Sequence, residues 1–275
     1  MSDFLSLMAA PFVGCLVLVG LHAYMGIHVL ARGVIFVDLA IAQLAALGAT
    51  VALLVGYTLE GKAAYGFSLL FVLLGAGFFA LIRTRHERIS QEAIIGITFV
   101  VASAASILAV DRAPHGAEHI KGLLVGSILW VTWPTIARTA AVYMGIGFLH
   151  WIFRRRLLQI SRDPERAQRE GVSLRLWDFV FYASFGVMIV LSVPIAGVLL
   201  VFSFLIVPAV CGALFSNRTR AQLFVGWGIG LAGSMVGCGL SYQLDLPTGA
   251  TVVCTFGLVL LILAATRIIL RKGAD

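Results

Sequence analysis

The sequence has little charge and few cysteines, and each shortage argues against a class of protein. Only 12% of the 275 residues are charged, against about 25% in a typical soluble protein. The four cysteines lie one at a time in apolar runs without CxxC spacing, which argues against a disulfide framework and against a zinc site. We therefore expect Cys15, Cys211, Cys238 and Cys254 to act as small buried apolar side chains.

Two motifs of catalytic proteins are also absent. No GxxxxGKS/T phosphate loop occurs in the sequence, so the chain does not carry its own ATP site. No HExxH pair lies in an apolar run, which argues against a metal-dependent enzyme inside a membrane. We therefore predict that the chain has no catalytic residues and is not an enzyme.

Apolar residues, by contrast, make up 60% of the chain, and the mean hydropathy is +1.01. They fall in blocks of about 20, the length of helix that crosses a lipid bilayer. The blocks occupy residues 10–31, 35–57, 64–82, 92–110, 133–153, 178–194, 196–215, 221–241 and 250–268. The first block lacks a basic start and an evident cleavage site, so we interpret it as a span and not as a signal peptide. The sequence predicts an all-α polytopic membrane protein with about eight or nine transmembrane helices.

The basic residues indicate how these spans are oriented. If the polar loop around residues 154–175 faces the cytoplasm, alternation of the spans places 16 of the 20 lysines and arginines inside. Only four fall outside: Lys62, Arg112, Lys121 and Arg138. Because cytoplasmic loops carry an excess of basic residues, we predict an N-terminus outside and a C-terminus in the cytoplasm. The same placement explains the net charge of +7 without nucleic acid as a partner.

Two places interrupt the pattern of plain spans. Residues 122–130 (GLLVGSILW) are apolar but only about half a span long, which favours a short re-entrant segment. At Pro194 and Gly197 the backbone loses one amide donor and gains conformational freedom. Interrupted helices are tolerated in a membrane only where they are buried or line a cavity. Both places therefore predict backbone arranged around a pathway.

Few ionisable residues lie inside the spans, and each is a candidate functional residue because charge in a membrane is costly. The candidates are His22 and His28 in the first span, and Asp38 with the neutral Gln43 in the second. Carboxylate and imidazole groups together suit zinc, manganese or ferrous iron. A structural hydrogen bond between Asp38 and a histidine is the competing interpretation, because a buried carboxylate needs a partner.

Other polar residues are weaker candidates. Glu92 and Asp178 are expected to begin helices at the cytoplasmic side, where an acidic residue favours the helix N-terminus. In the loop between the fourth and fifth spans, three residues could weakly hold a cation, and these are His115, Glu118 and His119.

The longest polar stretch, residues 154–178, contains a short helix whose two ends are marked in the sequence. Asp163 can cap the free amides, Pro164 suits the first helical position, and Gly171 suits the stop. A helix over residues 164–170 would be about 10 Å long, too short to cross a bilayer. The stretch is either a solvated surface loop or a docking segment for a cytoplasmic partner.

Six motifs, in order along the chain, carry a resemblance to a known family. They are Arg32 with residues 36–48 (FVDLAIAQLAALG), 92–97 (EAIIGI), 122–129 (GLLVGSIL), 163–172 (DPERAQREGV), 194–209 (PIAGVLLVFSFLIVPA) and 241–249 (SYQLDLPTG). With them the chain resembles, over nearly its whole length, the permease subunits of metal-uptake ATP-binding-cassette (ABC) transporters, the ZnuB-like and MntB-like family. Members of that family often place a histidine four residues after the aspartate, where this chain has Ala42.

The resemblance implies a single permease domain over residues 1–275, working as a homodimer in the bacterial cytoplasmic membrane. Its partners would be a separate cytoplasmic ATPase and an extracytoplasmic metal-binding protein. Its cargo would be a divalent ion (zinc, manganese or iron), with no permanently bound cofactor. Residues 163–172 would be the coupling helix that docks on the ATPase, through Asp163, Pro164, Glu165, Arg166, Ala167, Arg169 and Gly171. The metal pathway would include Asp38, His28, His22 and Gln43.

A second interpretation, from a different class, is a carrier driven by an ion gradient, in which Asp38 and a histidine carry protons. The capped helix in the polar stretch favours the ABC permease, because a gradient-driven carrier has no need for a docking segment at that place.

Overall fold

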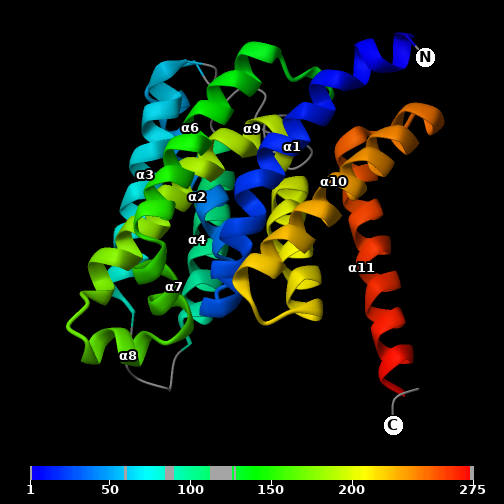
Figure 1. Cartoon of the computed structure of the whole chain (residues 1–275). Helices are drawn as coiled ribbons and strands as arrows, with labels where there is room; N and C mark the ends of the chain where they lie inside the picture. Colours follow the sequence, from blue (N-terminus) through cyan, green and yellow to red (C-terminus); the bar gives the residue numbers. More distant parts are fainter. Residues whose placement is uncertain (1, 59–60, 84–89, 112–125, 127, 273–275) are drawn as a thin grey trace. The chain divides into compact units, whose positions relative to one another are not determined.

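The computed structural model describes residues 2–58, 61–83, 90–111, 126 and 128–272 (Figure 1). Within these residues every regular element is a helix. The chain forms two compact units. Unit 1 takes its described residues from the ranges 1–30, 125–141 and 195–275, and unit 2 takes its described residues from 31–124 and 142–194.

Most of these helices have the length and composition of membrane spans. Among the described residues, seven helices are long and apolar enough to cross a membrane. There are eight if the pair Trp133–Ile152 and Arg154–Arg162, bent by 76°, is counted as one span. Each apolar block predicted from the sequence lies on one of these helices. The predicted all-α polytopic fold is therefore confirmed.

The longest element, α9 (Leu174–Phe215), contains two of the predicted blocks, 178–194 and 196–215. Its 42 residues would be about 63 Å long at ~1.5 Å per residue, roughly twice the thickness of the hydrocarbon core. The helix is interrupted at Gly197, where φ is 75° and ψ is 158°. The two predicted spans are therefore joined in one broken element, and the break lies where the sequence indicated it.

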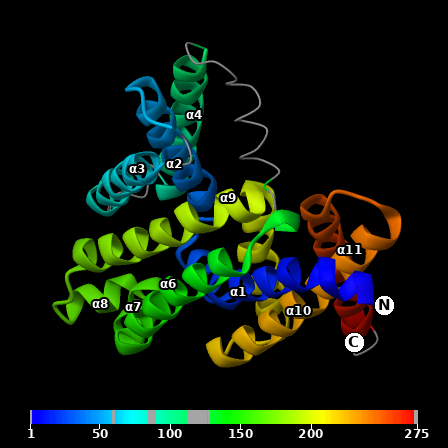
Figure 2. The same ribbon diagram turned by 90° about the horizontal axis from the view of Figure 1, so that it is seen from above.

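Unit 1 contains most of α1 (Ser2–Arg32), the pair α10 (Thr219–Leu244) and α11 (Thr248–Lys272), and the short 3₁₀ helix η1 (Ile128–Trp130). The pair α10 and α11 pack together as a hairpin, which both views show (Figure 2). In the turn between them the Ser241 hydroxyl lies 2.8 Å from the Leu246 carbonyl oxygen and 2.8 Å from the Thr248 hydroxyl. These bonds hold the turn closed.

Glycine makes the contact between α10 and α11 close. A Cβ atom on Gly233 would lie 2.8 Å from the Phe256 ring, and one on Gly237 would lie 2.7 Å from the Cα atom of Val252. Helices in membranes use such small residues to bring their backbones together. The Gly233 and Gly237 pair therefore serves packing within this chain.

A second close approach lies at the break in α9. Gly126 has a φ of 68°, and a Cβ atom there would overlap the backbone of Ala196 and Gly197. Of the short apolar segment at 122–130, the structure describes Gly126 and η1, and the remainder lies outside the described residues. The expectation of a re-entrant piece therefore concerns mainly residues outside the described ones. His115, Glu118 and His119 also lie outside the described residues.

Unit 2 is built around α2 (Val37–Leu54), which packs against both α3 (Lys62–Leu81) and α4 (Gln91–Val110). It also contains most of α6 (Trp133–Ile152), then α7 (Arg154–Arg162), α8 (Pro164–Arg169) and the first half of α9. At the contact of α2 with α3, the Ser68 hydroxyl donates a hydrogen bond of 2.9 Å to the Ala45 carbonyl oxygen. Figure 2 shows α8 following directly on α7.

The four cysteines are free. Cys15, Cys211 and Cys238 are buried, as predicted. For Cys254 the prediction is wrong, because it is exposed on α11, a helix that leaves most of its surface uncovered by the rest of the chain.

The contact of α2 with α3 makes a direct prediction. A Cβ atom on Gly48 would lie 2.5 Å from the Phe67 carbonyl oxygen, so Gly48→Ala forces backbone apart. We expect it to lower the free energy of unfolding by about 1–3 kcal/mol. Gly66→Ala on the same helix pair meets nothing within 4 Å and should leave stability unchanged or raise it by up to ~1 kcal/mol. Thermal unfolding of the detergent-solubilised protein compares the two, and equal midpoints would contradict the packing described here.

Candidate metal pathway and coupling site

Asp38 is a buried carboxylate without a partner in the described part of the chain. It is the second residue of α2, and its exposed fraction is 0%. Val37, Ala40 and Ile41 around it are also fully buried. Neither carboxylate oxygen has a hydrogen-bond partner among the described residues. The alternative of a structural hydrogen bond to Asp38 is therefore not observed there.

An unpaired carboxylate in an apolar interior is unstable as an anion. Removing such an ion from water costs several kcal/mol unless a counter-charge or hydrogen bonds replace the water. The helix N-terminus at Asp38 supplies only part of that, about 1 kcal/mol or less. The site therefore requires a cation or a proton. Carboxylate oxygens are suitable ligands for divalent ions.

The two candidate histidines lie on α1, in unit 1, and both are buried. The His22 Nδ1 atom is 2.7 Å from the Leu18 carbonyl oxygen. Because a carbonyl can only accept, Nδ1 carries the hydrogen and Nε2 of the neutral ring carries the lone pair that binds metals. His28 packs edge-on against Tyr24, with 4.8 Å between ring centroids. Six residues apart on one helix, the histidines are separated by about 9 Å along the axis, too far to bind the same ion.

Gln43 is not brought together with Asp38. Five residues further along α2, it lies about 140° around the helix and about 7.5 Å along the axis from Asp38. The position on the same face as Asp38, four residues on, is Ala42, which is buried at 2% exposure. Within each unit, the described residues contain no cluster of three His, Cys, Asp or Glu side chains. Of the four predicted pathway residues, Asp38 is thus the one whose surroundings require a cation or a proton.

Sequence reasoning missed two hydroxyl groups in unit 2. The Tyr143 hydroxyl on α6 donates a hydrogen bond of 3.3 Å to the Met188 carbonyl oxygen, and the Ser192 hydroxyl on α9 donates one of 3.0 Å to the same atom. The two residues are isolated hydroxyls in separate apolar spans, and no sequence pattern links them to each other.

Asp178 is a second buried carboxylate of unit 2, and it is fully paired. One oxygen accepts a hydrogen bond of 2.5 Å from Arg32 Nη1, and the other accepts one from Arg83 Nη1. We expected Asp178 to begin a helix, and this is wrong because α9 begins at Leu174 and Asp178 lies beyond its first turn. Glu92 does lie in the first turn of α4, where it accepts a 3.0 Å bond from the Phe36 amide.

The short helix α8 has the ends that the sequence predicted. The Asp163 side chain accepts a 2.9 Å hydrogen bond from the Arg166 amide, and Pro164 is the first helical residue. Gly171 follows with a φ of 78°. The helix ends at Arg169, one residue earlier than expected, with Glu170 as its C-cap. The cap residues are therefore confirmed, and their partner remains a proposal.

Glu170 fastens α8 to α7. Its carboxylate accepts hydrogen bonds of 2.8 Å from Arg166 and 2.6 Å from Gln159, a residue of α7. These bonds, that of Arg166 first, lower the pKa of Glu170 and keep it ionised. Ala167 is buried, whereas Glu165, Arg166 and Arg169 are exposed. The helix thus presents charged side chains outward from a fixed base.

A comparison with protein families matches residues 5–267 to the ABC 3 transport family. The chain belongs to this family. It is a multi-pass membrane protein of the metal-transporting ABC type, as the sequence motifs indicated.

Relatives of the permease have names that refer to metal transport. It is 27% identical over 188 residues to a Haemophilus influenzae protein named "Probable iron transport system membrane protein", covering 68% of this chain and 67% of the relative. It is 24% identical over 229 residues to the manganese transport system membrane protein MntC of Listeria innocua, covering 83% and 79%. Among solved structures, PsaBC from Streptococcus pneumoniae in complex with Fab gives a TM-score of 0.78 at 22% identity, covering 95% of this chain and 94% of the other. That likeness shows the fold.

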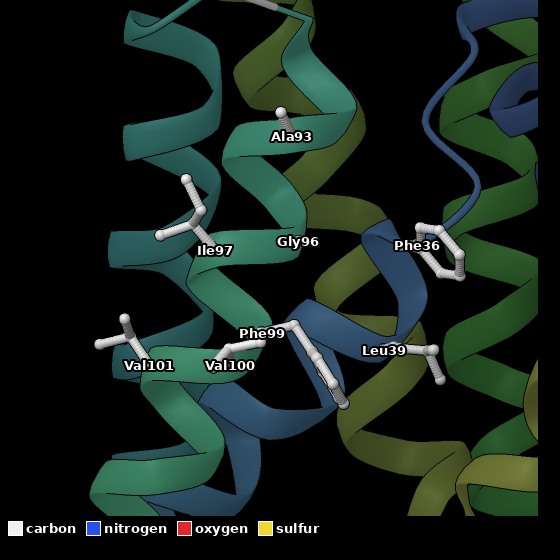
Figure 3. Close-up of a pocket in the computed structure, with 8 residues that line it drawn as sticks. All are labelled: Phe36, Leu39, Ala93, Gly96, Ile97, Phe99, Val100 and Val101. Atoms are coloured by element: carbon white, nitrogen blue, oxygen red, sulfur yellow. The ribbon is translucent and has the colours of Figure 1, made fainter.

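The permease also has an apolar groove of about 600 Å³ between the start of α2 and α4 (Figure 3). All eight lining residues are apolar, namely Phe36, Leu39, Ala93, Gly96, Ile97, Phe99, Val100 and Val101. A groove with such a lining offers no oxygen or nitrogen side-chain ligand for a metal ion. Asp38 is not among its lining residues, so the groove is not the candidate pathway.

The two buried carboxylates predict opposite effects of the same substitution. Asp178→Asn leaves the charges of Arg32 and Arg83 without a counter-charge, so we expect destabilisation of about 3–5 kcal/mol. Asp38→Asn removes a charge that has no partner, so the metal-free permease should be as stable as the wild type or more stable. Thermal unfolding in detergent with a metal chelator measures both midpoints. A large loss of stability for Asp38→Asn would show that Asp38 has a structural partner.

Proposed function

We propose that this permease carries a divalent metal ion, zinc, manganese or iron, into the cell across the bacterial cytoplasmic membrane. The observation that carries the proposal is the buried carboxylate of Asp38, which has no partner among the described residues. A cation in transit supplies the counter-charge that this position lacks. The names of relatives, which refer to iron and manganese, support this class of cargo.

A transport site must bind its ion weakly enough to release it. A single carboxylate meets this requirement better than a complete set of strong ligands. Manganese and ferrous iron accept oxygen ligands, whereas zinc favours nitrogen and sulfur. A neutral imidazole such as that of His22 or His28 would extend the pathway to zinc. The metal is cargo in this scheme, and no permanently bound cofactor is required.

In this proposal residues 1–275 form one permease domain that works as a homodimer with two separate components. A cytoplasmic ATPase hydrolyses ATP, and an extracytoplasmic protein delivers the metal. The orientation follows the basic residues, with the N-terminus outside and the C-terminus and α8 in the cytoplasm. The segment 163–172 is the coupling helix, and its exposed residues Glu165, Arg166 and Arg169 contact the ATPase. The family match does not favour the gradient-driven carrier.

Asp38→Ala tests the metal pathway. We expect the variant to assemble but to lose at least about tenfold of its uptake, because one ionic ligand contributes ~1.4 kcal/mol or more. The measurement is uptake of radioactive manganese, zinc and iron by proteoliposomes that contain the complete transporter. Ser106→Ala is the matched control, because Ser106 is also buried in a span but bonds within its own helix, to the Ala102 carbonyl. Unchanged uptake in Asp38→Ala would remove Asp38 from the pathway.

Replacing Glu165, Arg166 and Arg169 together by alanine tests the coupling helix. We expect metal uptake to fall and the ATPase to lose its stimulation by metal-loaded binding protein, because these side chains project from α8 toward the partner. The control replaces Arg218 and Arg220, which are exposed arginines at the start of α10, and should preserve both activities. If the triple variant still binds the ATPase and still responds to the binding protein, the docking role of α8 is wrong.

A further inference from the structure

We propose that the buried cluster of Asp178, Arg32 and Arg83 is the joint that transmits movement of α8 to α1, α2 and α9. In this joint Arg32 is a positioning residue for transport, because it holds the helices in place. The Ser161 hydroxyl of α7 contacts Arg32 directly. The inference rests on the proposed function, because it takes α8 as the segment that the ATPase moves.

The cluster connects three elements of the chain at one carboxylate of unit 2. Asp178 lies on α9, Arg32 ends α1, and Arg83 follows α3. The side-chain exposures of Arg32 and Asp178 are 3% and 0%, so water does not compete for the bond between them, whereas Arg83 is half-buried. Each carboxylate oxygen has its own arginine. A displacement of any of these elements must therefore move the others or break a buried ion pair, which costs several kcal/mol.

Arg32 extends the cluster to α7. While its Nη1 atom donates to Asp178, its Nε atom donates a hydrogen bond of 2.9 Å to the Ser161 hydroxyl. The guanidinium plane also lies over the Phe181 ring, 4.1 Å from the centroid. Only the planar fork of arginine makes these contacts together, since lysine has one donor group and no plane to stack. Arg32 thus joins α7 to α9.

The last connection runs from α7 to α8. Only Asp163 separates the two helices along the chain, and Glu170 bridges them through Gln159 and Arg166. The Val172 amide donates a 3.0 Å bond to the Ala167 carbonyl and closes the end of α8. A push on α8 therefore displaces α7 and, with it, Ser161. From Ser161 the displacement reaches Arg32 through a single hydrogen bond.

A short stretch of chain connects Arg32 to Asp38, the residue proposed to bind the metal. Asp38 follows Arg32 by six residues, which span at most about 20 Å of chain. The turn between α1 and α2 is tight, because the Val37 amide donates a 3.2 Å bond to the Val34 carbonyl and both valines are fully buried. Glu92 holds the Phe36 amide in the same turn. Movement of Arg32 is thus passed to the start of α2, where Asp38 lies.

A buried ion cluster is weak support for stability, because apolar residues of similar volume are often as stable. Compared with apolar residues, the charged side chains fix the relative positions of the helices that they join. The cluster therefore predicts a defect in coupling that is separate from any defect in folding. The quantity to measure is the number of metal ions transported per ATP hydrolysed by the complete transporter in proteoliposomes.

Two variants test the joint. Arg32→Lys keeps the charge beside Asp178 but removes the bond to Ser161 and the stacking on Phe181, and we expect the metal-to-ATP ratio to fall about tenfold, the factor for a hydrogen bond to a charged group. Ser161→Ala removes the acceptor of Arg32 Nε and should lower the ratio in the same direction. In both, ATPase binding and ATP hydrolysis should persist. The controls are Arg155→Lys, at an exposed arginine of α7, and Ser203→Ala, at a buried serine that bonds within its own helix.

The outcomes separate this inference from the proposed function. If the triple alanine variant of α8 uncouples the transporter while Arg32→Lys and Ser161→Ala keep the wild-type ratio, α8 is the coupling helix and the joint is wrong. If Arg32→Lys does not assemble, Ser161→Ala decides, because it leaves both ion pairs of Asp178 in place. A wild-type ratio in Ser161→Ala would then overturn the joint.

Discussion

A charge that leaves water inside a membrane protein requires a counter-charge, and this constraint explains how the permease uses its two buried carboxylates. Asp178 is neutralised by two arginines of its own chain, one on each oxygen. Asp38, in the same unit, has no partner among the described residues. The first arrangement makes a permanent joint between helices. In the proposed function, the second leaves a position that a passing cation would occupy and leave.

The remainder of unit 2 supports these two positions. The short turn from α1 to α2 places Arg32 and Asp38 six residues apart, and its buried valines and the Glu92 bond hold it in shape. On the other side of the cluster, the capped helix α8 is fastened to α7 through Glu170. In the proposed coupling, a push on α8 would pass through hydrogen bonds to Arg32, and from there along the chain to the start of α2.

The features that sequence could predict are those with a local signal. The spans follow from apolar blocks of about 20 residues, and the ends of α8 follow from Asp163, Pro164 and Gly171, each of which acts on its nearest neighbours. The break in α9 was indicated by Pro194 and Gly197. By contrast, the bond from Arg32 to Asp178 joins residues 146 positions apart, and no local pattern reports such a pairing. The same is true of Gly126 against the α9 break. Gln43 was a candidate because it is close to Asp38 in sequence. Five residues along a helix, however, place it on a different face of α2.

The central claim is that the unpaired carboxylate of Asp38 receives the transported ion. The most direct test is to record X-ray diffraction at the manganese absorption edge from crystals of the complete transporter trapped with manganese. The account predicts an anomalous peak next to the Asp38 carboxylate. A peak elsewhere in the membrane-spanning region, with Asp38 still without a ligand, would contradict it.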